Sequence, residues 1–157
     1  MNRWLDADIP DVAGHLFGRD RLSLSPARAG LKEAFGPVCF YCGSRVPADN
    51  PVDHVLPWSR VGIDGIANLV LACRRCNGDK LHALPSLALM DRALARDRGI
   101  LEQIADSIAW PTEYGRVLSA ARGVYRGEPV GAPTWDGFRR SRQLDVVFPP
   151  DWLRVDV

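Results

Sequence analysis

Residues 39–80 read CFYCGSRVPADNPVDHVLPWSRVGIDGIANLVLACRRCNGDK, and this segment holds all four cysteines of the chain. The cysteines form two C-x-x-C pairs, Cys39 with Cys42 and Cys73 with Cys76, separated by 30 residues. Each pair has the spacing at which thiolates bind zinc, and two pairs supply the four ligands of a closed tetrahedral site. The spacing therefore predicts a structural Zn²⁺ ion. The two cysteine pairs that bind it lie on either side of a functional insertion.

Three other interpretations of the cysteines remain open from the sequence. Two disulfides would require an oxidising compartment, but Asp6 and Asp8 lie where a signal peptide needs an apolar run. A thioredoxin-like redox motif would explain one pair but not both. Four unconnected buried cysteines would make the matched spacing a coincidence. We expect zinc and a reducing, cytoplasmic location.

The residues around the cysteines predict a strand, a loop, a second strand and a helix. Residues 52–56 and 69–72 are short apolar runs typical of strands, and residues 57–67 carry two glycines typical of a loop. A helix is expected from residue 74 to about residue 83. The order predicts a small α+β core.

The flanks of this core predict helices. Ser25, as an N-cap, and Pro26, at the first helical position, indicate a helix that ends before Gly36. Two more helices are expected after the capping residues Ser86 and Thr112. The first of these two is broken or weakened at Gly99, and the chain is expected to be irregular over residues 1–24 and from residue 127 onward.

Three side chains in the insertion and just after the second cysteine pair are typical of a hydrolase site. His54 is the one histidine between the cysteine pairs, and imidazole is a natural general base near neutral pH. Asp53 and Asn77 supply oxygen atoms, which Mg²⁺ prefers as ligands. Because neighbouring side chains of a regular strand face opposite sides, Asp53 and His54 reach one site only if the strand twists, bulges or ends there.

Three sequence elements follow one another in this segment: C-F-Y-C, D-H-V-L-P-W-S-R-V-G and N-L-V-L-A-C-R-R-C-N-G-D-K. In this order they resemble the HNH nuclease family over about residues 37–82. That family has a ββα-metal fold. The resemblance implies that Asp53 and Asn77 bind a catalytic Mg²⁺ or Mn²⁺ ion and that His54 is the general base. It also implies that Asn68 holds the loop and orients His54.

The resemblance leads us to expect a metal-dependent endonuclease that hydrolyses DNA, with RNA as a second option, and leaves 5′-phosphate and 3′-hydroxyl ends. One rival is a noncatalytic zinc-finger-like module that binds nucleic acid or a protein. Another is a nuclease subunit of a larger restriction, phage-defence or phage-packaging complex, with a protein partner or a second copy. The formal net charge of +1 mildly favours recognition through a partner.

Other side chains are weaker candidates. Trp58 either stacks on a base or packs in the core, and His15 and His82 are expected to be noncatalytic. The arginines of the C-terminal region either bind a nucleic-acid backbone or lie on solvent-exposed helix faces. These arginines are Arg116, Arg122, Arg126, Arg139, Arg140 and Arg142. Three residues around the start of the expected helix could contact substrate phosphate, or they could simply form its solvated face: Arg74, Arg75 and Lys80.

Length and composition indicate how many domains the chain forms and what class of protein it is. The chain has 157 residues, the length of about one domain. Its 46% hydrophobic and 25% charged residues are typical of a globular protein, and no apolar run approaches the roughly 20 residues of a membrane span. We expect one compact domain in three parts: a lead-in and helix at 1–36, a zinc-braced ββα-metal (HNH) core at 37–83, and a helical region and tail at 84–157.

Overall fold

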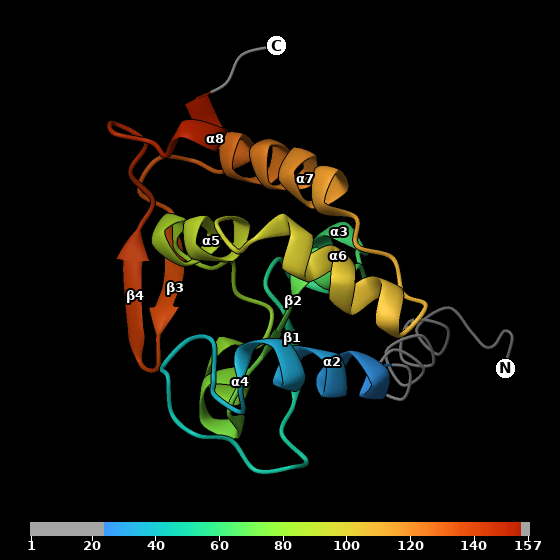
Figure 1. Cartoon of the computed structure of the whole chain (residues 1–157). Coiled ribbons are helices and arrows are strands. Elements are labelled where there is room, and N and C mark those ends of the chain that lie inside the picture. The colour runs from blue at the N-terminus through green and yellow to red at the C-terminus, as the bar shows by residue number, and fades with distance from the viewer. Residues whose placement is uncertain (1–23, 155–157) are drawn as a thin grey trace, which may run out of the picture.

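The structure is a computed structural model that describes residues 24–154, so almost all of the expected lead-in, including His15, lies outside the described residues. In Figure 1 a two-stranded sheet lies at the centre, with helices above and below it and a second strand pair at one edge. The elements are, in chain order, α2 (Ser25–Phe35), β1 (Val52–His54), α3 (Trp58–Val61), the 3-10 helix η1 (Ile66–Asn68), β2 (Leu69–Leu71), α4 (Arg74–Lys80), α5 (Leu87–Leu94), α6 (Arg98–Ser107), α7 (Tyr114–Gly127), β3 (Pro133–Gly137), β4 (Arg140–Gln143) and α8 (Asp151–Arg154).

The expected α+β core is confirmed as β1, β2 and α4. The two strands pair antiparallel, with Asp53 opposite Val70. Strand β1 is two residues shorter than expected because the N–H of Leu56 donates to the side chain of Asn68 at 2.9 Å, and Pro57 has no N–H to continue the pairing. The strand therefore ends at His54, one of the conditions under which neighbouring side chains can reach the same site.

The connection between the strands is more ordered than the loop expected over residues 57–67. It contains α3, which ends at Gly62 with a positive φ of 63°, and the turn η1 just before β2. Residues Ile63 and Ile66 of this connection are 1% and 0% exposed. Burial of these two side chains fixes the connection against the core.

The flanking helices follow the expected order with shifted boundaries. Helix α2 includes Ser25 as its first residue, so Ser25 is not the cap. Ser86 does cap α5, since its Oγ accepts a hydrogen bond from the N–H of Leu89. The next break lies before Gly99, because the Oδ1 atom of Asp97 accepts from the N–H of Ile100 and starts α6.

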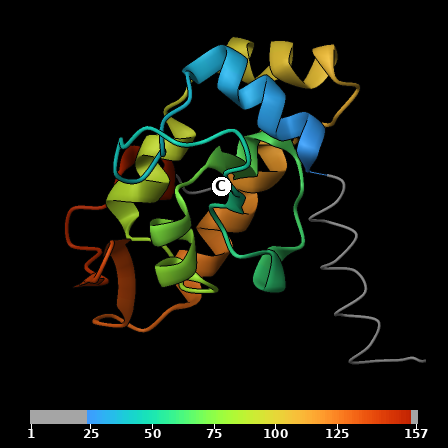
Figure 2. The ribbon, with the colours of Figure 1, turned by 90° about the horizontal axis from the view of Figure 1, so that it is seen from below.

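The start of α7 and the packing of α2 complete the helical part. Helix α7 follows Glu113, one residue later than the cap expected at Thr112. Helices α2 and α6 lie side by side, as Figure 2 shows. Buried residues of both helices, Leu31 and Leu101, belong to one hydrophobic cluster with the strands of the core.

The antiparallel hairpin β3–β4 replaces the irregular tail that the sequence predicts there. Trp135 exchanges backbone hydrogen bonds with the segment before α5, donating to the carbonyl of Leu84 and accepting from the N–H of Ser86, each at 2.8 Å. Its indole N–H donates to Asp79 of α4 at 2.9 Å. The hairpin therefore braces α4 from the C-terminal part of the chain.

No helix among residues 24–154 is long and apolar enough to cross a membrane.

Candidate active site and metal centre

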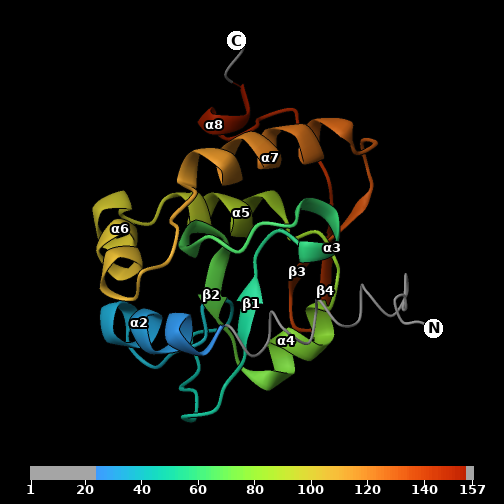
Figure 3. The ribbon, with the colours of Figure 1, turned by 90° about the vertical axis from the view of Figure 1, so that its right-hand side faces the viewer.

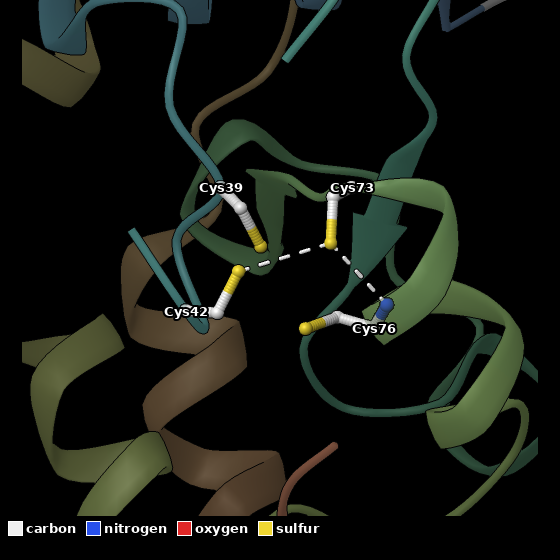
Figure 4. Close-up of side chains that lie close together, drawn as sticks. All are labelled: Cys39, Cys42, Cys73 and Cys76. Carbon is white, nitrogen blue, oxygen red and sulfur yellow. Dashed lines mark hydrogen bonds between the residues drawn. The ribbon is translucent and has the colours of Figure 1, made fainter. Parts of the chain in front are cut away.

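The four cysteine thiols converge on one point, as Figure 4 shows. Their Sγ atoms all lie within 4.8 Å of one another, and those of Cys42 and Cys73 are 3.8 Å apart. A tetrahedral zinc site with Zn–S bonds of about 2.3 Å has sulfur atoms about 3.8 Å apart. All four cysteines are free thiols, so the structure favours the zinc interpretation over two disulfides.

The protonation of the thiols without metal is uneven. Burial raises the pKa of Cys39 and Cys76. At Cys42 burial also acts to raise the pKa, but hydrogen bonds with Ser44, Cys39 and Cys73 together outweigh it and lower the pKa to about 6. Thiols bind zinc as thiolates, so metal binding must displace the remaining protons. We therefore expect the affinity for zinc to fall as the pH falls.

Local structure explains how each cysteine pair forms. Gly43 has a φ of +77°, a conformation that favours glycine, and its N–H donates to the carbonyl of Cys39 at 2.8 Å, closing the first turn. In the second pair, the Sγ atom of Cys73 caps α4 by accepting from the N–H of Cys76. The metal site therefore fixes the start of the helix that carries Asn77.

Asp53 connects the metal loop to the candidate active site. Its side chain is buried, and its Oδ2 atom accepts a hydrogen bond from the Tyr41 hydroxyl at 2.5 Å and lies 3.1 Å from Nζ of Lys80. Burial, together with the negative charge and hydrogen bond of Asp53, raises the pKa of Tyr41 well above its ordinary value, so Tyr41 stays protonated and donates. Oδ1 accepts no hydrogen bond from residues 24–154.

Lys80 does not lie where a substrate-binding lysine would. It is 1% exposed, and its ammonium group donates to the carbonyl of His54 at 2.9 Å in addition to pairing with Asp53. A phosphate on the surface cannot reach this buried group. The expectation of phosphate binding is therefore replaced by a structural role, in which Lys80 joins α4 to the end of β1.

His54 is half-buried at the end of β1. Its Nε2 atom lies 2.7 Å from Oδ1 of Asp64, in the connection between α3 and η1. Sequence reasoning did not select Asp64, because an acidic residue between two turn regions is common. Only the folding of this connection back toward β1 reveals the pair.

Asn68 holds the connection in place through three buried hydrogen bonds. Its Oδ1 atom accepts from the N–H of Leu56, and its Nδ2 atom donates to the carbonyls of Leu56 and Ile63 at 3.1 and 3.0 Å. The side chain is 0% exposed. These bonds join the end of β1 to the segment before Asp64, the kind of contact expected for a residue that holds the loop.

We expect Asn68→Ala to destabilise the protein strongly. The change leaves one N–H and two carbonyl groups buried without these partners, a loss of roughly 2–5 kcal/mol if each group costs about 1–3 kcal/mol and relaxation recovers part. The matched control is Asn77→Ala, since the Asn77 side chain makes no hydrogen bond within residues 24–154. Chemical denaturation curves measure the stability of both variants. Equal denaturation midpoints for the two variants would contradict this role of Asn68.

Asn77 is half-buried on α4 and faces the same cleft as Asp53 and His54. In Figure 3, β1 lies between α2 and α3, with α4 below. The cleft between these elements has a volume of about 430 Å³. It is lined by Leu24, Arg28, Pro51, Val52, Asp53, His54, Pro57, Trp58, Asn77, Leu81 and His82.

The cleft fits a hard divalent cation. Oδ1 of Asp53 accepts no hydrogen bond from residues 24–154, and Asn77 adds an amide oxygen to the same cleft. Such oxygen atoms are the kind of ligands that Mg²⁺ and Mn²⁺ take from a protein while keeping water and a substrate phosphate. Two charged or titratable lining residues that sequence reasoning did not assign to a site are Arg28, in α2, and His82, which follows α4. Both residues are more than twenty positions from the Asp53–His54 pair, so the sequence does not show that they line the same cleft.

The remaining basic candidates lie outside the cleft lining. Arg74 is exposed and forms an ion pair with Asp49 at 3.0 Å, while the guanidinium group of Arg75 lies 4.6 Å from the centre of the Phe138 ring. Most of the flanking arginines also have partners inside the protein. Arg116 pairs with Glu113, Arg142 pairs with Asp136, Arg140 donates to the carbonyl of Asp136, and Arg122 and Arg126 donate to carbonyls of α8.

Comparison with protein families agrees with this geometry. Residues 39–82 match the family model described as HNH endonuclease, a span that includes all four cysteines and the Asp53–His54 pair. The resemblance noted in the sequence is therefore confirmed over residues 39–82, which match an HNH domain. HNH proteins are generally endonucleases, so the domain indicates a nuclease or nucleic-acid-binding role. No curated protein and no solved structure matches the chain.

Proposed function

We propose that the protein is a metal-dependent endonuclease that hydrolyses phosphodiester bonds in DNA. The observation that carries the proposal is the meeting of Asp53, His54 and Asn77 at one cleft, next to four converging thiols. A base and two oxygen ligands on one cleft are what phosphodiester hydrolysis needs, because the reaction requires an activated water and a means to stabilise the leaving oxygen.

His54 is assigned the role of general base. It accepts the proton of the water that attacks phosphorus, in line with the departing 3′ oxygen. Such a reaction leaves a 5′-phosphate and a 3′-hydroxyl. His54 is suited to this role because it lines the cleft and its ring is held at Nε2 by Asp64, while its backbone is tied to α4 through Lys80.

Asp53 and Asn77 are assigned to the divalent cation. Tyr41 and Lys80 hold Asp53 by Oδ2, which orients the carboxylate and leaves Oδ1 for a ligand. When bound, Mg²⁺ or Mn²⁺ supplies positive charge that stabilises the leaving oxygen. The thiols take no part in the reaction, since four thiolates around zinc leave no open position for water.

The closed zinc site is assigned a structural role toward these residues. Phe40, between the first two cysteines, donates its backbone N–H to Leu71 of β2 at 2.8 Å, and Tyr41 reaches Asp53. The second pair starts α4, which carries Asn77. A zinc ion held by the four thiols would therefore join both halves of the site.

The test is a cleavage assay with the full chain on supercoiled plasmid, single-stranded DNA and RNA. We expect DNA to be cut with Mg²⁺ or Mn²⁺ but not with EDTA, and the ends to be rejoined by DNA ligase, which requires a 5′-phosphate and a 3′-hydroxyl. Binding without cleavage of any substrate would identify a noncatalytic module. Failure to cut with either metal, in protein that contains zinc, would contradict the proposal.

A further inference from the structure

The contact between His54 and Asp64 determines which nitrogen of the ring can act as a base. Oδ1 of Asp64 lies 2.7 Å from Nε2 of His54. A carboxylate only accepts hydrogen bonds, so Nε2 of the neutral ring must carry the proton. Nδ1 then keeps the free lone pair. The position of Asp64 therefore selects one of the two tautomers of His54.

The backbone around Asp64 is fixed by hydrogen bonds on both sides. The carbonyl of Asp64 accepts from the indole N–H of Trp110 at 2.8 Å. The carbonyl of the preceding residue, Ile63, accepts from Asn68 at 3.0 Å. Two consecutive carbonyls are thus held by different parts of the chain, which restricts rotation of the peptide that bears the carboxylate.

The link between α6 and α7 lies directly against the residues that follow Asp64. The N–H groups of Ile66 and Ala67 donate to the carbonyls of Pro111 and Thr112 at 2.9 and 3.0 Å. A Cβ atom on Gly65 would lie 2.5 Å from the carbonyl oxygen of Thr112, so only glycine permits this approach.

These contacts join the HNH domain to a segment beyond it. The segment 110–113 supplies the indole of Trp110 and two carbonyls, and it lies outside the family match at residues 39–82. An HNH core alone would lack these groups. The helical region of this chain therefore does more than cover the core, because it fixes the residue that contacts His54.

We propose that Asp64 is a positioning residue that sets the orientation and tautomer of His54, and that Trp110 holds Asp64 in place from outside the HNH match. The proposal rests on the proposed nuclease function, in which His54 is the general base. Asp64 acts through the ring of His54. Trp110 acts one step further away, through the backbone of Asp64.

The tautomer is measured by NMR on protein labelled with ¹⁵N-histidine, at a pH where imidazole is neutral. The chain has three histidines, and the His54 signals are assigned by their loss in His54→Ala. We expect wild type to show the form with the proton on Nε2, and Asp64→Asn to show a mixture, because the amide can both donate and accept. An unchanged tautomer in Asp64→Asn would overturn the proposal.

Kinetics provide the second readout. We expect Asp64→Asn to lower kcat by about 10- to 100-fold, with little change in KM, by analogy with removal of the hydrogen-bonding partner of a metal-binding histidine. The matched control is Asp91→Asn, whose carboxylate accepts from the indole of Trp152 far from His54 in the sequence. It should keep wild-type kcat. Equal kcat for the two variants would contradict a positioning role.

Trp110→Phe tests the outer contact with little loss of volume. Removal of one hydrogen bond that positions Asp64 should lower kcat by roughly 2- to 10-fold. Trp152→Phe is the control, because it also removes one indole hydrogen bond, to Asp91. The proposal is supported if both variants lose a similar amount of thermal stability but only Trp110→Phe loses kcat. Wild-type kcat in Trp110→Phe would overturn the role of Trp110.

The two readouts separate this proposal from the proposed function. Absence of cleavage by wild type would contradict the nuclease assignment, and the NMR measurement would still show whether Asp64 fixes the tautomer of His54. Cleavage by wild type together with an unchanged tautomer and kcat in Asp64→Asn would leave the nuclease in place and overturn the role of Asp64.

Discussion

His54→Ala is expected to lower kcat for DNA cleavage by about 10²- to 10⁴-fold, the usual contribution of a positioned general base. The loss follows because no other histidine in residues 24–154 pairs with Asp64. His82 also lines the cleft, but it lies after the end of α4 and has no such partner among these residues. The imidazole is half-buried and makes one side-chain hydrogen bond, to Asp64, so its removal should leave most of the fold intact. Steady-state cleavage of a labelled oligonucleotide in Mg²⁺ measures the effect.

The control for this variant is the state of the protein itself. Zinc content and the thermal midpoint of His54→Ala should remain close to those of wild type, since neither the thiols nor the contacts of Asn68 involve the ring. Cleavage at the wild-type rate would remove His54 from the role of base. A loss of both zinc and cleavage would show that the variant acts through the fold.

Removal of zinc is expected to unfold the core. Structural zinc contributes roughly 10–16 kcal/mol of apparent binding free energy in small domains, whereas whole domains are stable by only about 5–15 kcal/mol. The four thiols join the loop of Cys39 and Cys42 to the start of α4, so the metal-free chain loses this connection. Circular dichroism before and after a strong chelator measures the change.

Cys76→Ser is the matching variant, because Cys76 is fully buried and its thiol is one of the four ligands. It should contain less than one zinc ion per chain by elemental analysis and should melt at a lower temperature. Ser44→Ala is the control, since Ser44 contacts Cys42 but is not a ligand. A metal-free chain that keeps the melting curve of the zinc-bound chain would contradict a structural zinc.

The parts of the fold that the sequence predicts are those set by local spacing. The C-x-x-C pairs, the two short strands and the cap of Ser86 depend on residues within a few positions of each other, and the structure confirms each of them with small shifts. The family resemblance also placed Asp53, His54 and Asn77 in one site, and all three line one cleft.

The parts that sequence reasoning missed depend on contacts between distant segments. The hairpin β3–β4 is held by hydrogen bonds from Trp135 to residues about fifty positions earlier, and nothing in its Pro- and Gly-containing sequence shows this. From the sequence, Lys80 is expected on the surface of a short helix. In the structure its side chain is buried because it pairs with the buried carboxylate of Asp53. Asp64 lies next to His54 in a loop whose backbone also contacts Trp110, 46 residues later in the chain.

The most direct test of the account is an anomalous-scattering measurement on crystals grown with zinc and soaked in Mn²⁺. We expect a zinc peak at the centre of the four thiols and a separate manganese peak in the cleft, in contact with Asp53 and Asn77 and close to His54. A zinc peak without any manganese at Asp53 and Asn77, in a cleft open to solvent, would contradict the proposed catalytic centre.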